Sequence, residues 1–150
     1  MLMKGHLAMG LFAGLLFLPL VNNKLSFIPI ILIASLLPDL DVPNSYLGQK
    51  PIFRPLHLIF KHRGVIHSLT LCVFLSLISA WFFPVFALPF FLGYSVHLLV
   101  DSFTVEGISP FWPFKGEVIG KLKVGGKIEG IIFYLFVGLD FILLIRLFIL

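Results

Sequence analysis

Residues 82–91 read FFPVFALPFF and lie near the middle of the longest charge-free run in the chain. That run extends from Val65 to Val100, 36 residues without Asp, Glu, Lys or Arg. As a single helix it would be about 54 Å long, well beyond the roughly 30 Å hydrocarbon core of a bilayer. Pro84 and Pro89 interrupt it, and proline disrupts a helix. We therefore predict two membrane helices joined by a tight turn at these prolines.

The composition indicates an integral membrane protein. The chain has 150 residues, enough for one domain, so we expect residues 1–150 to form a single membrane-embedded unit. It is 59% hydrophobic and only 12% charged, with a mean hydropathy of +1.10, whereas soluble domains are about 25% charged. The single cysteine, Cys72, excludes a disulfide framework and a cysteine zinc site.

Three further apolar runs predict the remaining helices. Leu7 to Val21 and Leu25 to Leu37 are separated by the turn sequence NNK, and a third run extends from about Ile128 to Leu150. The first run lacks a small-residue cleavage site after it, so we expect a retained helix and not a signal peptide. The first two runs are short, either as spans of a thinned bilayer or as a hairpin that dips in and returns. The expected fold is an all-α polytopic bundle of about five membrane helices, the first two short.

The basic residues predict the orientation of this bundle. With five helices, one side holds the N-terminus and two longer loops, about 38–63 and 101–127. Two basic residues lie on the far side, Lys24 and Arg146, against nine on the starting side. The nine are Lys4, Lys50, Arg54, Lys61, Arg63, Lys115, Lys121, Lys123 and Lys127. Because short cytoplasmic loops are rich in Lys and Arg, we expect a cell membrane protein with a cytoplasmic N-terminus and an outer C-terminus.

Histidines and aspartates gather at the cytoplasmic ends of these helices. Such side chains are costly in apolar surroundings unless they are paired or bind a metal. We therefore predict a metal site at the cytoplasmic mouth of the bundle. Seven candidate ligands come from four helix ends: His6, Asp39, Asp41, His62, His67, His97 and Asp101.

Two of the spacings suggest how these residues meet. His97 and Asp101, four residues apart, share one helix face and could be two ligands, or a ligand and the carboxylate that orients it. Asp39 and Asp41 would share a face in an extended segment. The alternatives are a hydrogen-bonded His–Asp pair that closes a helix and a solvated helix end.

His62 and His67 begin the third helix in this prediction. They are five residues apart, about 140° around a helix, so they do not stack on one face. His62 could fold back from the loop if the helix starts at Gly64. Alternatively, both are interfacial histidines.

The donor types limit the metal and its chemistry. Oxygen and imidazole ligands without a thiolate suit Zn, Mn or Fe. Seven ligands exceed what one tetrahedral ion needs, and two ions with a bridging carboxylate would use them all. Arg63 could hold a phosphate oxygen bidentately, or act as a membrane anchor. Glu129 could be a general base or an outer ligand, or a charge favoured at a helix N-terminus.

The ordered motifs LLPDLD, HRGVIHS and GYSVHLLVDSFTVEG, after an early histidine, resemble the YdjM family. Its members are small inner-membrane proteins described as metal-dependent hydrolases, one of them LexA-regulated. The motif order is also distantly similar to zinc-dependent phospholipase C and the single-strand-specific zinc nucleases. That resemblance implies that His97 and Asp101 are central ligands, with Asp101 able to bridge. His6, one of Asp39 and Asp41, and one of His62 and His67 would complete the set. The chain has fewer candidate histidines than a three-zinc site requires, so we expect two ions, zinc first.

The sequence thus predicts a membrane-bound hydrolase that cleaves a phosphoester, such as a phospholipid or a related amphipathic phosphodiester, with a metal-activated water. Its partners would be the bilayer and an amphipathic substrate, without specific nucleic-acid binding. The oligomeric state is left open. The alternatives are a metal-ion transporter or sensor, in which Asp140 marks a pathway, and a non-catalytic structural metal site.

Overall fold

The structure is a computed structural model that describes residues 1–41, 45, 49–53 and 64–149. Over these residues it is all-helical, with two isolated β-bridges and no strand, which confirms the predicted fold class. The elements are α1 (Met3–Phe17), η1 (Leu18–Leu20), α2 (Lys24–Ala34), η2 (Leu37–Asp41), η3 (Pro51–Phe53), α4 (Leu69–Phe82), α5 (Pro84–Ser102) and α6 (Lys127–Ile149).

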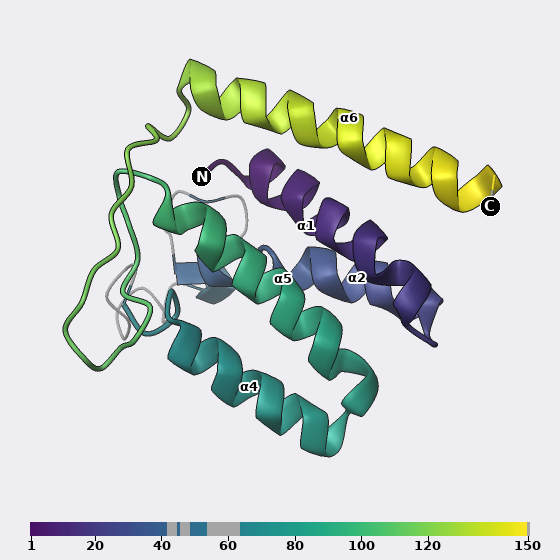
Figure 1. Ribbon diagram of the computed structural model, residues 1–150. Coiled ribbons are helices and arrows are strands. Elements are labelled where there is room, and N and C mark those ends of the chain that lie inside the picture. Colours follow the sequence, from purple (N-terminus) through teal and green to yellow (C-terminus); the bar gives the residue numbers. More distant parts are fainter. Residues whose placement is uncertain (42–44, 46–48, 54–63, 150) are drawn as a thin grey trace.

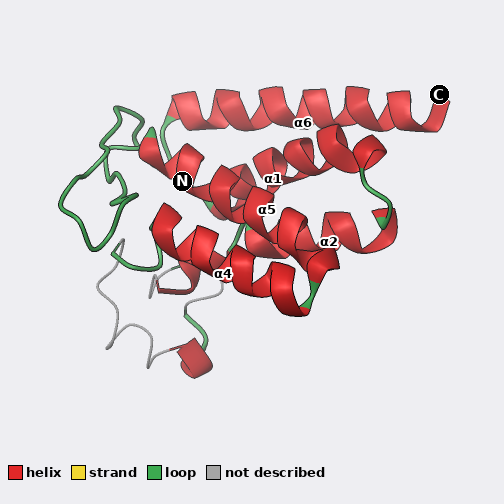
Figure 2. Cartoon of the chain, turned by 60° about the horizontal axis from the view of Figure 1, so that its bottom comes forward, coloured by secondary structure: helices red, strands yellow, loops and turns green. Residues whose placement is uncertain are grey.

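Helix α5 is the centre of the bundle and contacts α1, α2 and α4, whereas α6 packs against α1 (Figure 1). The N-terminus, the start of α4, the end of α5 and the start of α6 lie at one end of the molecule. The turn between α4 and α5, the connection between α1 and α2, and the C-terminus lie at the other end. Figure 2 shows the same division from a second direction. The fold therefore has two distinct ends, as the alternation of apolar runs predicts.

Within the described part of the chain, three helices are long and apolar enough to cross a bilayer: Met3–Leu20, Pro84–Ser102 and Lys127–Leu147. Helices α2 and α4 are apolar but shorter. The first helix starts four residues earlier than predicted and continues through η1, so it reaches 18 residues. The prediction that the first two helices are short therefore holds for α2 but not for α1, which is long enough to span when η1 is included. The other short helix is α4.

The third predicted helix begins later than the sequence suggested. Helix α4 starts at Leu69, so His67 precedes it instead of lying inside its first turn. Ser68 is extended and its side chain accepts a hydrogen bond from the Leu71 amide (3.2 Å), which is the geometry of a helix N-cap. At the other end Phe83 alone separates α4 from α5, and Pro84 occupies the first turn of α5, where its missing N–H costs nothing. The predicted turn is confirmed, while Pro89 lies inside α5.

The loop between α5 and α6 folds back on itself. The Val105 and Leu122 amides donate to the Leu122 and Phe103 carbonyls, and Ile108 and Val118 exchange two hydrogen bonds of 2.9 and 3.0 Å. The loop also covers the start of α4, because the Pro110 carbonyl accepts from the Leu69 amide at 2.8 Å. This loop therefore closes one end of the bundle.

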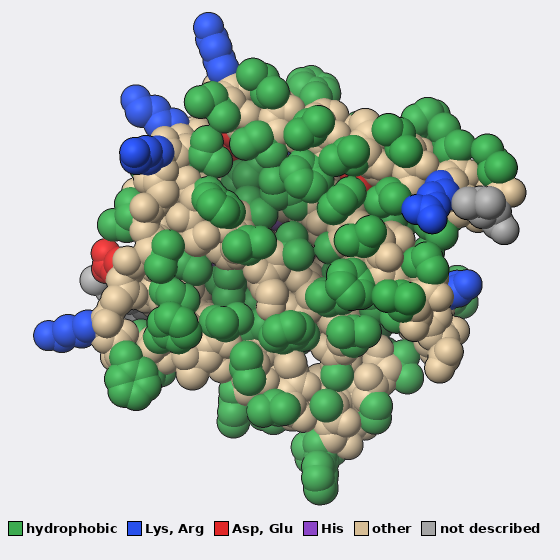
Figure 3. Space-filling model, in the orientation of Figure 1, with side chains coloured by type: hydrophobic (Ala, Val, Ile, Leu, Met, Phe, Trp, Pro, Cys, Tyr) green, Lys and Arg blue, Asp and Glu red, His purple; other side chains and the backbone are tan. Residues whose placement is uncertain are grey.

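The outward faces of the helices are apolar (Figure 3). Leu77 and Trp81 on α4 are 65% and 82% exposed, and Phe141 on α6 is 65% exposed. A water-soluble monomer rarely leaves so much contiguous apolar surface uncovered. These faces suit contact with lipid.

Close packing of α2 against its neighbours depends on small residues. A Cβ atom at Gly93 of α5 would lie 2.3 Å from the Ile31 carbonyl oxygen and 2.9 Å from the Ala34 Cβ. A Cβ atom at Gly10 of α1 would lie 2.9 Å from the Ser35 Oγ. Small residues let helix backbones approach closely in membranes. Gly93 therefore sets the distance between α2 and α5.

We expect Gly93→Ala to destabilise the protein by about 1–3 kcal/mol, because the added methyl group meets backbone atoms that cannot rotate away. The measurement is thermal unfolding of the purified protein in detergent. Gly138→Ala is the matched control, since a Cβ atom there meets nothing within 4 Å. Equal melting temperatures for the two variants would contradict the role of Gly93.

Candidate metal centre

The centre is built on the last turns of α5. His97 and Asp101 lie one turn apart on the same face, with His97 Nε2 at 3.5 Å from Asp101 Oδ2, and both side chains are fully buried. His97 Nδ1 lies 2.8 Å from the Ser35 carbonyl oxygen, beyond the end of α2. A carbonyl only accepts, so Nδ1 carries the proton, and in the neutral imidazole Nε2 then keeps its lone pair toward the centre. A backbone carbonyl that accepts from the other ring nitrogen in this way commonly orients a metal-binding histidine.

His6 comes from the first turns of α1. Its ring stacks on that of His97, with centroids 3.8 Å apart and an interplanar angle of 12°. His6 Nε2 lies 3.4 Å from Asp101 Oδ1, and the side chain is fully buried. The imidazoles of His6 and His97 therefore both face the carboxylate of Asp101.

Asp39 enters from η2, which follows α2. Its Oδ1 lies 3.8 Å from His97 Nε2. The segment is a 3₁₀ helix and not extended, so the expectation that Asp39 and Asp41 share a face through strand alternation is wrong. The side chain of Asp41 lies outside the described part of the structure.

His67 comes from the segment before α4. Its Nε2 lies 3.8 Å from Asp101 Oδ2, and its ring is edge-on to that of His97, with centroids 5.4 Å apart. The Tyr94 hydroxyl donates to the Ile66 carbonyl, and the Ser68 hydroxyl donates to the Val65 carbonyl at 2.6 Å. The Tyr94 bond holds the short segment that carries His67 against α5, and the Ser68 bond closes a turn within that segment.

The spacing of these atoms fits a bound cation. His6, Asp39, His97 and Asp101 each offer a ligand atom, and the four atoms lie within 4.8 Å of one another. Ligands of one tetrahedral zinc ion are about 3.3–3.5 Å apart, given metal–ligand distances of about 2.0–2.1 Å. The 3.4 and 3.5 Å separations from His6 and His97 to Asp101 match this value.

The hydrogen bonding supports the same interpretation. Among the described residues, neither ring nitrogen of His6 has a hydrogen-bond partner, and neither does His97 Nε2. Buried polar atoms without partners cost about 1–3 kcal/mol each, so native structures rarely keep them without an ion or water. Nitrogens that converge on buried carboxylates are suited to a divalent cation. This group of His and Asp residues could therefore hold a metal ion.

Asp101 is the shared element of the group. Its Oδ1 faces His6, and the Met1 amino nitrogen lies 2.5 Å from the same oxygen. Its Oδ2 faces His97 and His67. The two oxygens of one carboxylate thus point at two sets of partners.

Glu129 is buried at the start of α6, outside this group. One carboxylate oxygen accepts from the Leu2 amide at 2.7 Å and the other from the Gly125 amide at 2.6 Å. Both oxygens therefore bind backbone. This geometry favours a role in holding the first residues of the chain beside Asp101, and not the general-base role that the sequence suggested.

Other sequence-predicted residues are not part of the described centre. His62 and Arg63 lie outside the described residues. Asp140 is buried in α6, and it lines a separate groove with Lys4 and apolar residues of α1, α2 and α6. Nothing in the described geometry connects Asp140 to the centre.

The sequence alone did not identify the residues that hold the side chains of the centre in position. Ser35 acts through its carbonyl and Gly93 through its missing side chain, so neither carries a side-chain signal for metal binding. Tyr94 could have been noticed, because a buried tyrosine usually finds a hydrogen-bond acceptor.

Fold and site together define a helical membrane protein with a buried His/Asp group at one end of the bundle. The family model described as YdjM inner membrane protein matches residues 1–147, and the chain belongs to this family. Two curated relatives, each called inner membrane protein YdjM, come from Escherichia coli strain K12 and Shigella flexneri. Each is 42% identical over 96 residues, which cover 57% of this chain and 48% of the relative. The chain thus spans about half the length of the curated relatives it matches. No solved structure matches it.

We expect Asp101→Asn to lower metal affinity by at least about tenfold, because the carboxylate that the three imidazoles approach loses its charge. Elemental analysis of detergent-purified protein after reconstitution with zinc measures this directly. Asp140→Asn is the control, since it removes a buried carboxylate of the same size outside the group. Equal metal content in the wild type and both variants would refute the centre.

We expect Glu129→Gln to lower stability by about 1–3 kcal/mol, because an amide offers only one acceptor oxygen to the two backbone amides. Thermal unfolding measures the loss. Metal content should remain at the wild-type level at saturating zinc. A complete loss of metal with unchanged stability would instead indicate that Glu129 is a ligand.

Proposed function

We propose that this chain is a membrane-bound, metal-dependent hydrolase that cleaves a phosphoester at the cytoplasmic face of the cell membrane. The observation that supports it most is the convergence of histidine and aspartate side chains from α1, η2, the segment before α4, and α5 around His97 and Asp101. A purely structural helix end would satisfy these atoms by hydrogen bonds, yet neither ring nitrogen of His6 has one among the described residues.

We propose that the centre holds two divalent ions, zinc first and manganese or iron as alternatives. His6 with Asp101 Oδ1 would hold one, and His97 with Asp101 Oδ2 the other, since the two oxygens face different histidines. Asp39 and His67 would complete the sets. Such ions lower the pKa of a coordinated water and stabilise the charge that develops on a phosphoryl group.

The reaction consumes one water for each bond cleaved. The water oxygen forms a new bond to phosphorus, the ester P–O bond breaks, and the leaving oxygen takes a proton to become an alcohol. The Ser35 carbonyl keeps the proton of His97 on Nδ1 throughout, so Nε2 stays available. Arg63, near His67 in sequence, remains the predicted partner of a phosphate oxygen.

The position of the centre suggests an amphipathic substrate. Lys4 and the basic residues of the loops follow the positive-inside pattern, which supports a position of the centre near the cytoplasmic leaflet. A phosphoester in that leaflet belongs to a lipid headgroup. We therefore propose a phospholipid or a related amphipathic phosphodiester as substrate.

We expect the zinc-reconstituted protein to hydrolyse a chromogenic phosphodiester and a phospholipid in mixed micelles, and to lose the activity on chelation. His97→Ala should lower the rate by at least about a hundredfold, because a ligand is lost. Asp140→Asn should retain it. Product release is followed by absorbance and by mass spectrometry.

The hydrolysis assay and a metal-transport assay together separate the alternatives. Bound metal without turnover of either substrate would favour a structural metal site. Metal movement across proteoliposomes that Asp140→Asn abolishes would favour a transporter.

A further inference from the structure

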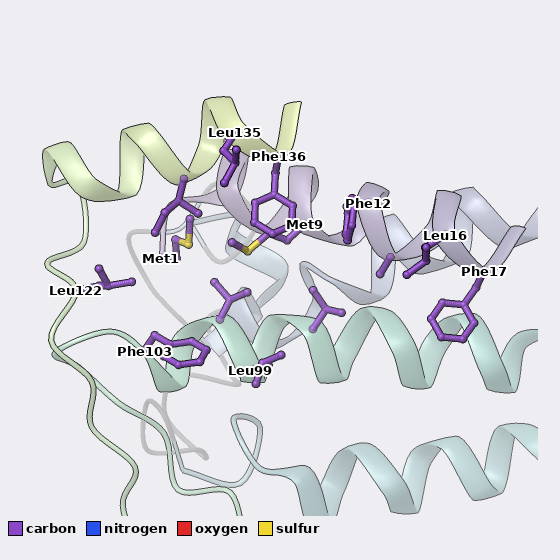
Figure 4. Close-up of a pocket in the computed structure, with 14 residues that line it drawn as sticks. Met1, Met9, Phe12, Leu16, Phe17, Leu99, Phe103, Leu122, Leu135 and Phe136 are labelled. Carbon is purple, nitrogen blue, oxygen red and sulfur yellow. The ribbon is translucent and has the colours of Figure 1, made fainter. Parts of the chain in front are cut away.

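A long apolar groove runs between α1, α5 and α6 (Figure 4). Its volume is about 560 Å³, and all fourteen lining residues are apolar. Known ligand pockets span about 300–1,000 Å³, so the groove is large enough for a ligand. It is a different cavity from the one that Asp140 lines.

One end of the groove adjoins the metal centre. Val100 lines the groove and directly precedes Asp101 in α5. Met1 also lines it, and the Met1 amino nitrogen lies 2.5 Å from Asp101 Oδ1. A molecule in the groove would thus have one end beside the candidate ligands.

The groove follows the direction of the helices. Figure 4 shows Met1, Leu122 and Phe103 toward the loop end, and Leu16 and Phe17 toward the far end. Helix α1 has 15 residues, about 22 Å, whereas one leaflet of the hydrocarbon core is about 15 Å thick. In a bilayer that α1, α5 and α6 cross, the groove would run alongside the lipid chains and be long enough for one of them.

The loop end of the groove is basic. Leu122 lines the groove, and the exposed Lys121 and Lys123 flank it in sequence, with Lys127 at the start of α6. Lysines at a membrane surface attract anionic lipid headgroups, by about 1 kcal/mol each. The polar end of an occupant would accordingly be negatively charged.

We propose that the groove binds one acyl chain of an anionic phospholipid and places its phosphate at the metal centre. The placement of the phosphate rests on the proposed function, whereas the binding of the chain does not. The apolar lining, its direction and its basic mouth match a single lipid from the cytoplasmic leaflet. The lipid would then enter the groove laterally from the bilayer, and its phosphoester would be hydrolysed while its chains stay in the membrane.

The test uses the full chain in nanodiscs that contain phosphatidylglycerol with a diazirine on one acyl chain. After illumination, mass spectrometry locates the adducts. We expect adducts concentrated on groove-lining residues of α1, α5 and α6, such as Phe12, Leu99 and Phe136. Adducts spread evenly over the outward faces of α4 and α6 would overturn the proposal, as would cross-links that show a second copy in the groove.

Two variants fill the groove from different helices: Ala13→Phe from α1 and Leu99→Trp from α5. Each should lower groove adducts about tenfold, which is a large change in occupancy. Leu77→Trp on the outward face of α4 is the control and should leave them unchanged. Two folded groove variants that both label like the wild type would contradict the proposal.

Metal content measured on the same samples separates this inference from the proposed function. If the wild-type protein binds no metal but its groove is still labelled, the hydrolase proposal is refuted and the proposed lipid site stands. If the protein binds metal but its groove is not labelled, only the proposed lipid site is refuted.

Discussion

The structure depends on the cost of burying ionisable groups at the end of a helix bundle. Asp101 is fully buried, with the Met1 amino nitrogen 2.5 Å from its Oδ1. A carboxylate in such surroundings is stable only when partners surround it. Here α1, α5 and the segment before α4 each bring an imidazole to it, and η2 brings a second carboxylate to His97. The burial of one aspartate thus ties four separate segments together.

The backbone packing around α2 makes that arrangement geometrically feasible. Because Gly93 has no side chain, α5 lies directly against the Ile31 carbonyl and the end of α2. The Ser35 carbonyl then comes within 2.8 Å of His97 Nδ1 and sets which ring nitrogen faces the centre. A helix contact in the apolar part of the bundle therefore determines the chemistry at its polar end.

The same helices leave an apolar groove beside the centre. Helix α6 packs mainly on α1, so the space between α5 and α6 is not filled by side chains. In water such a groove would be costly, but in a bilayer lipid chains can occupy it. A polar centre and an apolar groove that adjoin through Val100 and Met1 together match the two halves of a phospholipid.

The sequence alone determined the broad architecture. The charge-free run with Pro84 predicted the hairpin of α4 and α5, and the four-residue spacing of His97 and Asp101 predicted their shared face. Both follow from local geometry, namely helix length and helix period. Sequence also predicted that histidines and aspartates gather at one end, because alternation of spans decides which helix ends are neighbours.

Only the tertiary structure decided which of those side chains meet. His67 reaches Asp101 from a turn before α4 that Tyr94 holds, whereas the sequence pattern predicted it at the start of that helix. Glu129 shares the same end of the bundle but binds the Leu2 and Gly125 amides. The orientation of His97 comes from a main-chain carbonyl 62 residues away. Contacts of this kind depend on backbone approach and loop course, and neither is encoded in the spacing of residue types.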